Sequence, residues 1–174
     1  MNKSNEIFVT RNVDSEFSIT DEIKRRGFSY ACPVLENKVI EANKLIAEKL
    51  QLPIASRVCS FCKLRVVEGQ PVAIEQIYID ENDTPSLSST DMNHRSFYQW
   101  CKTEYGYEVM RSEEEIKVVH ASEKEASLLK IKPDDEVMML EGVTYKTDIK
   151  PFEFFQIISI PGFYRFRSCT HGEK

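Results

Sequence analysis

The stretch FCKLRVVEGQPVAIEQIYID, residues 61–80, contains two runs rich in β-branched and aromatic residues, separated by a glycine and a proline. This pattern predicts a β-hairpin with strands over residues 57–67 and 71–79. Lys63 and Arg65 stand where a strand that faces a core would carry Val or Ile. The two cations therefore indicate that this face of the hairpin has a function of its own.

The faces of the hairpin follow from the alternation of side chains along a strand. Lys63 and Arg65 share one face of the first strand, while apolar residues such as Leu64 share the other, which we expect to be the core face. Glu75 joins the cations if the loop has an odd number of residues, such as the three residues 67–69. A loop with an even number of residues would place Glu75 on the opposite face.

Two cations and a carboxylate on one face suit the recognition of a phosphorylated polyol. The cations would bind the phosphate, and the carboxylate would accept hydrogen bonds from hydroxyl groups. In the alternative interpretation, Lys63 and Arg65 are ordinary solvent-facing residues of an amphipathic hairpin, and Glu75 is their cross-strand ion-pair partner. The spacing of the three residues leaves both interpretations open.

The rest of the chain alternates short helices with strands. Ser18 and Ser96 each stand at the predicted start of a helix, and Ser122 with Glu125 forms a capping-box pattern. This alternation predicts an α+β fold built on one antiparallel sheet. The predicted helices lie within residues 18–26, 41–52, 96–105 and 122–129, and the further predicted strands lie within 30–40, 107–121, 136–147 and 152–160.

The composition excludes several classes of protein. The chain has 174 residues and a formal net charge of -5, and its 23 basic residues are dispersed instead of forming the stripe that nucleic-acid binding needs. No apolar stretch is long enough to span a membrane, and no signal-peptide pattern opens the chain. We therefore expect one cytoplasmic domain that contacts no membrane.

The cysteines and histidines do not predict a metal centre or a nucleophile. The five cysteines are an odd number without the dense spacing of a disulfide scaffold, which fits a reducing compartment. Cys59 and Cys62 form a CxxC, but residues three apart in a strand point to opposite faces and cannot hold one ion. We expect no metal, no cofactor and no catalytic residue.

Four strings of the sequence resemble the UTRA domain, the effector-binding module of the HutC branch of the GntR transcriptional regulators. In chain order they are SITDEIKRRG from residue 18, CKLRVVEGQPVAIEQIYI from residue 62, RSFYQWCKTEYGYEV from residue 95, and ASEKEASLLKIKPDDEVMMLEGVTY from residue 121. The resemblance covers about residues 14–168. It implies a homodimer with a chorismate-lyase-like fold, in which an antiparallel β-sheet and surrounding short helices enclose a small-molecule pocket.

The resemblance also implies which residues hold the effector. Ser18 and Ser96 would help the two cations to bind a phosphate, and Glu153 would reach the polar end of the ligand. For the serines, simple helix capping is the alternative role. Lys63 stands where the family's RxR pattern begins with arginine, so it supplies charge without a bidentate fork, and a carboxylate is an alternative anion to a sugar phosphate. The implied effector-binding residues are Ser18, Lys63, Arg65, Glu75, Ser96 and Glu153.

The family normally carries an N-terminal winged helix-turn-helix. The string IFVTRN looks like the last strand of such a wing, so we expect residues 1–13 to be a linker or wing remnant and residues 14–170 to be the effector-binding domain. The expected function is that of a non-catalytic sensor, which contacts DNA only through an attached winged helix-turn-helix. The alternatives are an enzyme of the chorismate-lyase type and a standalone small-molecule-binding module.

Overall fold

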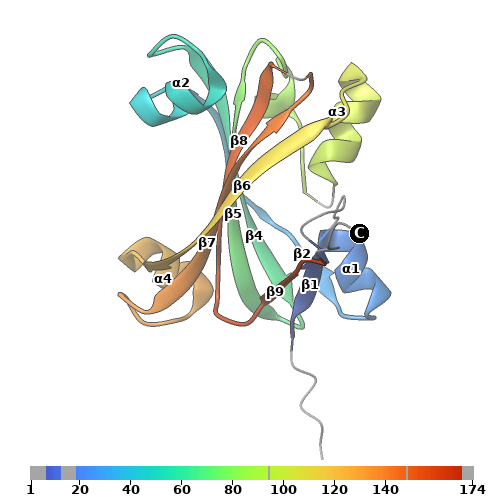
Figure 1. The fold of residues 1–174 in the computed structure, drawn as a ribbon, viewed down its shortest axis with the longest axis vertical. Helices are drawn as coiled ribbons and strands as arrows, with labels where there is room; N and C mark the ends of the chain where they lie inside the picture. Colours follow the sequence, from blue (N-terminus) through green and yellow to red (C-terminus); the bar gives the residue numbers. More distant parts are fainter. Residues whose placement is uncertain (1–6, 13–18, 94, 148, 170–174) are drawn as a thin grey trace, which may run out of the picture.

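A computed structural model describes residues 7–12, 19–93, 95–147 and 149–169 of the chain (Figure 1). Its elements, in chain order, are β1 Val9–Asn12, α1 Ile19–Arg25, β2 Tyr30–Ala31, β3 Val34–Glu41, α2 Lys44–Leu50, β4 Arg57–Val67, β5 Gln70–Asp80, the 3-10 helix η1 Leu87–Ser89, α3 Phe97–Tyr105, β6 Arg111–His120, α4 Glu123–Leu129, β7 Glu136–Tyr145, β8 Pro151–Ser159 and β9 Tyr164–Arg167.

A seven-stranded antiparallel sheet forms the centre of the molecule. Its strands lie in the order β2-β4-β5-β8-β7-β6, and β3 also pairs with β4. The predicted α+β class with an antiparallel sheet is confirmed. Helices α2 and α4 cover one face of this sheet, and α1 and α3 cover the other (Figure 1).

The β4–β5 hairpin forms as the sequence predicts, but its turn differs. Lys63 lies directly opposite Glu75, so of the two faces left open by the sequence the carboxylate takes the cationic one. The predicted three-residue loop is wrong, because the turn has two central residues, Glu68 and Gly69, with φ of 51° and 74°. A β-bulge leaves Val72 without a partner in β4, and this extra residue supplies the odd offset.

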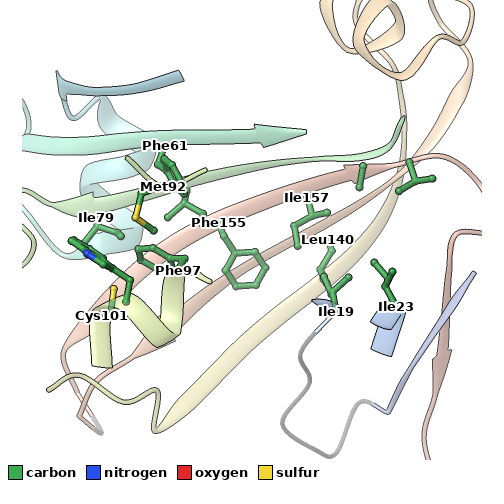
Figure 2. Packing of buried hydrophobic residues seen from close by; sticks show 14 of the residues in the cluster. Ile19, Ile23, Phe61, Ile79, Met92, Phe97, Cys101, Leu140, Phe155 and Ile157 are labelled. Carbon is green, nitrogen blue, oxygen red and sulfur yellow. The ribbon is translucent and has the colours of Figure 1, made fainter. Parts of the chain in front are cut away.

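The cationic face of β4 also carries the main hydrophobic core. Phe61 is fully buried there, beneath Phe97 of α3, and Ile19 and Ile23 of α1 lie over the neighbouring strands (Figure 2). The opposite face of the sheet packs in two smaller clusters against α2 and α4. The expectation that only the opposite face of the hairpin is core is therefore wrong. Helices cover both faces, so the cations point into the interior.

The ends of the helices follow the capping signals of the sequence. Ser122 and Glu125 form the predicted capping box at the start of α4, and Gly106 ends α3 with φ of 68°. Helix α4 ends at Leu129, the last residue of the predicted range, and Lys130 is its C-cap residue. Helix α1 begins at Ile19, and its predicted cap, Ser18, lies outside the described residues.

A second sheet, which the sequence analysis does not predict as such, joins the two ends of the described chain. Strand β1 pairs in parallel with β9, with Val9 opposite Tyr164, and Val9 is fully buried in the main core. Strand β1 lies within the segment 1–13 that we expect to be a linker or wing remnant. This part of the segment packs against the domain, and its origin in a wing stays a prediction.

Gly142 of β7 leaves room for the aromatic ring of Phe155, the residue opposite it in β8, to lie over the β7 backbone. A methyl group at this position would lie 2.6 Å from Cζ of Phe155 and 2.7 Å from the backbone oxygen of Glu113. We expect Gly142→Ala to lower the free energy of unfolding by about 1–3 kcal/mol, the usual cost of overpacking, in equilibrium urea unfolding. In a background that carries Phe155→Leu, Gly142→Ala should cost less stability, because the smaller side chain leaves room for the added methyl group. A Gly142→Ala variant as stable as the wild type would contradict the prediction.

Candidate functional site

Arg65 is a charged side chain in the interior of the protein, with 8% of its surface exposed. Its Nη2 donates a hydrogen bond to Oε2 of Glu75 at 2.6 Å, and its Nη1 donates to the hydroxyl oxygen of Tyr30 at 2.6 Å. Burial has the largest single effect and lowers the pKa of Arg65, but Glu75 together with Tyr30, Tyr164 and Cys32 outweighs it, and the pKa is raised well above its usual value. The guanidinium therefore stays charged within the core.

Lys63 is buried beside this pair, with 4% of its surface exposed. Its ammonium group donates to the backbone oxygen of Arg95 at 3.0 Å and lies 4.9 Å from the centroid of the Phe61 ring. Burial lowers the pKa of Lys63. An ammonium group has three donors, so the contact with Arg95 leaves capacity to bind a further acceptor.

The alternative interpretation of the hairpin as a solvent-facing ion-pair surface is wrong. The cross-strand ion pair between Arg65 and Glu75 does exist, but its two side chains are only 9% and 15% exposed. The cluster of Lys63, Arg65 and Glu75 carries one positive charge in excess. Because an isolated charge is costly inside a protein, this cluster favours the binding of an anion.

The start of helix α3 lies at the same place. Ser96 is its N-cap residue by backbone position, but its side chain makes no capping hydrogen bond, so the simple capping role considered for it is not observed. Lys63 bonds the carbonyl of the preceding residue, Arg95, which brings the cation to this helix end. Backbone N–H groups and the helix dipole favour an anion at such a position.

Of the five buried side-chain polar atoms that have no hydrogen-bond partner among the described residues, three belong to Arg65 or to residues near it. They are Nε of Arg65, the hydroxyl of Tyr164 and the hydroxyl of Ser159. Ser159 lies opposite Ala73 in the sheet, and Ala73 lies opposite Arg65, so Arg65 and Ser159 belong to one row on the same face. Buried polar atoms without partners are costly, and a polar ligand could satisfy these three.

The sequence analysis misses Tyr30, Ser159 and Tyr164. Tyr30 lies at the site because β2 pairs with β4. Tyr164 belongs to β9, a strand of four residues with no strong periodic signal. Ser159 ends a predicted strand, but its proximity to Arg65 depends on the order of strands in the sheet. The local sequence contains no signal for these long-range contacts.

Glu153 forms a second polar centre on the same face of the sheet. It is 1% exposed, and its Oε2 accepts hydrogen bonds from the hydroxyls of Tyr98 at 2.6 Å and Thr144 at 3.0 Å. Burial raises the pKa of Glu153 to about 8, so the carboxyl is neutral at pH 7. A neutral carboxyl both donates and accepts, which suits a ligand hydroxyl.

The structure thus separates the predicted site residues into two groups. Lys63, Arg65, Glu75 and the start of α3 at Ser96 lie together, whereas Glu153 lies four residues along β8 from Ile157, the residue opposite Glu75. At the usual rise of a strand, this offset is about 13 Å. Aromatic core residues such as Phe61, Phe97 and Phe155 occupy the intervening face (Figure 2). Ser18 lies outside the described residues.

The described residues hold no group of three or more His, Cys, Asp or Glu side chains able to bind a metal ion. Cys59 and Cys62 pack in different hydrophobic clusters, on opposite faces of β4, as their spacing predicts. Among the described helices, none is long and apolar enough to cross a membrane.

The sequence matches the UTRA domain family over residues 25–160, so the chain belongs to this family. It is similar to the HTH-type transcriptional repressor NagR of Bacillus subtilis strain 168, with 22% identity over 136 residues that make up 78% of this chain and 56% of NagR. The chain thus corresponds to little more than half of that relative.

Solved structures of regulators share the fold. PhnF from Mycobacterium smegmatis superposes with a TM-score of 0.85 at 19% identity, covering 95% of this chain and 73% of that chain. A GntR-family transcriptional regulator from Bacillus cereus gives a TM-score of 0.74 at 22% identity, covering 82% of this chain and 99% of that chain. The resemblance to effector domains of GntR-family regulators and the chorismate-lyase-like fold are confirmed.

The raised pKa of Glu153 has a consequence for stability. The folded protein keeps this proton to about pH 8, whereas an unfolded glutamate releases it near 4.5. Between these values the unfolded state binds fewer protons, so this group makes the free energy of unfolding fall as pH rises, by up to about 1.4 kcal/mol per pH unit. We expect Glu153→Gln, which cannot ionise, to show a shallower fall between pH 5.5 and 8 in urea unfolding.

The matched control for this experiment is Glu48→Gln, at an exposed glutamate of α2. This variant should keep the pH dependence of the wild type. If Glu153→Gln and the wild type lose stability in parallel as pH rises, the neutral state of Glu153 is refuted.

Proposed function

We propose that this chain is the ligand-sensing domain of a GntR/HutC-type transcriptional regulator and binds a small anionic effector, in the first place a sugar phosphate. The observation that carries the proposal is the buried excess of positive charge at Lys63 and Arg65, next to the start of α3. A phosphate would neutralise this charge and accept from the unpartnered Nε of Arg65.

The second polar centre fits the other end of such a ligand. Glu153 with Tyr98 and Thr144 offers hydroxyl and carboxyl groups of the type that hold sugar hydroxyls. The aromatic and aliphatic residues between the two centres can pack against a carbon skeleton. A carboxylate ligand is the second choice of anion, because Lys63 has no guanidinium group with which to bind a phosphate through two hydrogen bonds.

The regulatory part of the proposal rests on the relatives. NagR is named as an HTH-type transcriptional repressor, and this chain matches 56% of its length. We propose that a winged helix-turn-helix is attached on the N-terminal side of β1, with residues 1–13 as linker or wing remnant, and that it makes the DNA contacts. We also propose that the protein is a cytoplasmic homodimer, because two DNA-binding heads then face a two-fold operator.

A thermal-shift panel tests the class of effector. Because a ligand that binds only the native state raises apparent stability, a sugar phosphate at about 100 times its dissociation constant should stabilise the protein by about 2.7 kcal/mol. The panel should contain matched pairs of sugar and sugar phosphate, with small carboxylates and inorganic phosphate alongside. No response to any anion, or a better response to the neutral sugars, would argue against the proposal.

Lys63→Met tests the anion site with little change in side-chain length. The variant loses a charged hydrogen bond to the ligand, so we expect affinity for the best sugar phosphate of the panel to fall by about 1.5–3 kcal/mol in calorimetric titration. Arg65 is a poorer probe, since its removal leaves Glu75 without its buried partner and lowers stability as well.

The control for Lys63→Met is Lys38→Met, which removes an exposed lysine of β3 that pairs with Glu36. It should bind with wild-type affinity. Equal affinity of the Lys63 and Lys38 variants would show that Lys63 does not contact the effector.

A further inference from the structure

Cys32 lies in the short gap between β2 and β3, at a position opposite Arg65 of β4. Strand β2 pairs with β4 in an antiparallel register that begins with Tyr30 opposite Val67. Strand β3 resumes the same register with β4 at Val34. Because the register is the same on both sides of the gap, it places Cys32 directly opposite Arg65.

The side chain of Cys32 belongs to the inner face of the sheet. Tyr30 and Val34, two residues before it and two after it, both pack against the main hydrophobic core. Side chains alternate between the two faces of a strand, and in agreement Cys32 is half-buried whereas Ala31 is exposed. The thiol therefore lies on the face that carries Arg65.

The electrostatics of the site place Cys32 beside the cations. Burial has the largest effect on the pKa of Lys63 and lowers it, and Cys32 has the next largest effect and raises it. Burial also has the largest effect on the pKa of Tyr30 and raises it, Arg65 lowers it, and Cys32 raises it further through its charge and a hydrogen bond. Because the Tyr30 hydroxyl also accepts from Nη1 of Arg65, the thiol, the hydroxyl and the guanidinium are neighbours.

A second observation indicates that further oxygen atoms can bind at this place. Both Nη atoms of Arg65 have hydrogen-bond partners, but its buried Nε has none among the described residues. Lys63 bonds the backbone oxygen of Arg95, and an ammonium group has two more donors. These cationic donors form strong hydrogen bonds to anionic oxygens.

We propose that Cys32 is a modification site for hydrogen peroxide, and that its sulfinate takes the place of the effector's anionic group beside Lys63 and Arg65. The sulfur attacks one peroxide oxygen, an S–O bond forms as the O–O bond breaks, and the thiol proton passes to the leaving oxygen, which gives a sulfenic acid and water. A second peroxide converts the sulfenic acid to a sulfinic acid and water, and the sulfinic acid releases its proton. Each step removes two electrons from sulfur and reduces one peroxide.

The sulfinate neutralises the excess positive charge of the cluster from within the chain. Hydrogen peroxide is small and uncharged, which suits a half-buried thiol, and the product stays attached opposite Arg65. An oxidised domain would therefore be closed to an anionic effector. This inference rests on the anion site of the proposed function, but its tests measure oxidation state and melting temperature. A failure of the effector proposal appears separately, in the ligand panel.

Peptide mass spectrometry after peroxide treatment tests the modification. The dose is raised until the exposed Cys169 is oxidised, and Cys32 should then have gained two oxygen atoms. Treatment should raise the melting temperature of the wild type by at least about 3 °C, because the sulfinate gains charged hydrogen bonds. Cys32→Ser is the control: its methionines and other cysteines receive the same treatment, and it should show no rise.

Three results would overturn the modification. They are a Cys32 that stays unmodified when Cys169 is oxidised, a disulfide between Cys32 and Cys169 in place of the sulfinate, and a melting temperature that does not rise although the sulfinate forms.

Cys32→Asp tests the anion without peroxide, with Cys32→Asn as a neutral control of the same size. The aspartate variant should melt at least about 3 °C above the asparagine variant, because its carboxylate pairs with the two cations. In a Lys63→Met background this difference should fall to about half or less. Any sugar phosphate that stabilises the wild type should bind Cys32→Asp at least about tenfold more weakly than Cys32→Asn. Equal melting temperatures of the two variants would show that position 32 does not place an anion against Lys63 and Arg65.

Discussion

The buried guanidinium of Arg65 is the constraint on which the site depends. A charge in this position requires partners from several elements, and it has Glu75 from the neighbouring strand β5 and Tyr30 from β2. Losing one partner of a buried ion pair typically costs about 3–5 kcal/mol. The bulge at Val72 is therefore a structural requirement, because without its extra residue Glu75 would face the other side of the sheet.

Helices α1 and α3 convert this polar face of a sheet into an interior site. Their apolar residues pack against the same face that carries the cations, so the low-dielectric surroundings strengthen every charge interaction there. The same burial lowers the pKa of Lys63 and raises that of Glu153. One end of the site thus has excess positive charge, and the other has a neutral carboxyl. The effector that we propose, with an anionic end and a hydroxyl end, would match this polarity.

Local signals in the sequence predict part of this arrangement. The two strands of the hairpin and the capping box of α4 depend on residues close together in the chain, and they form as predicted. The hairpin also shows the limit of local signals. Glu75 shares the cationic face because of the bulge at Val72, and not because of the three-residue loop that the sequence suggests. Tyr30 and Tyr164 reach the site through pairings of β2 with β4 and of β9 with β1, and such contacts leave no periodic pattern.

Strand β1 connects the strand that carries Tyr164 with the segment before which we propose the DNA-binding head. Val9 pairs with Tyr164, whose buried hydroxyl has no hydrogen-bond partner within the described part of the chain, and Arg11 forms an ion pair with Glu114 of strand β6. A ligand that bonds to Tyr164 would favour the conformation in which β9, and with it β1, is held in place. A ligand can shift an equilibrium only by its differential affinity for two states. In this domain, such a difference would reach the proposed DNA-binding head through the position of β1.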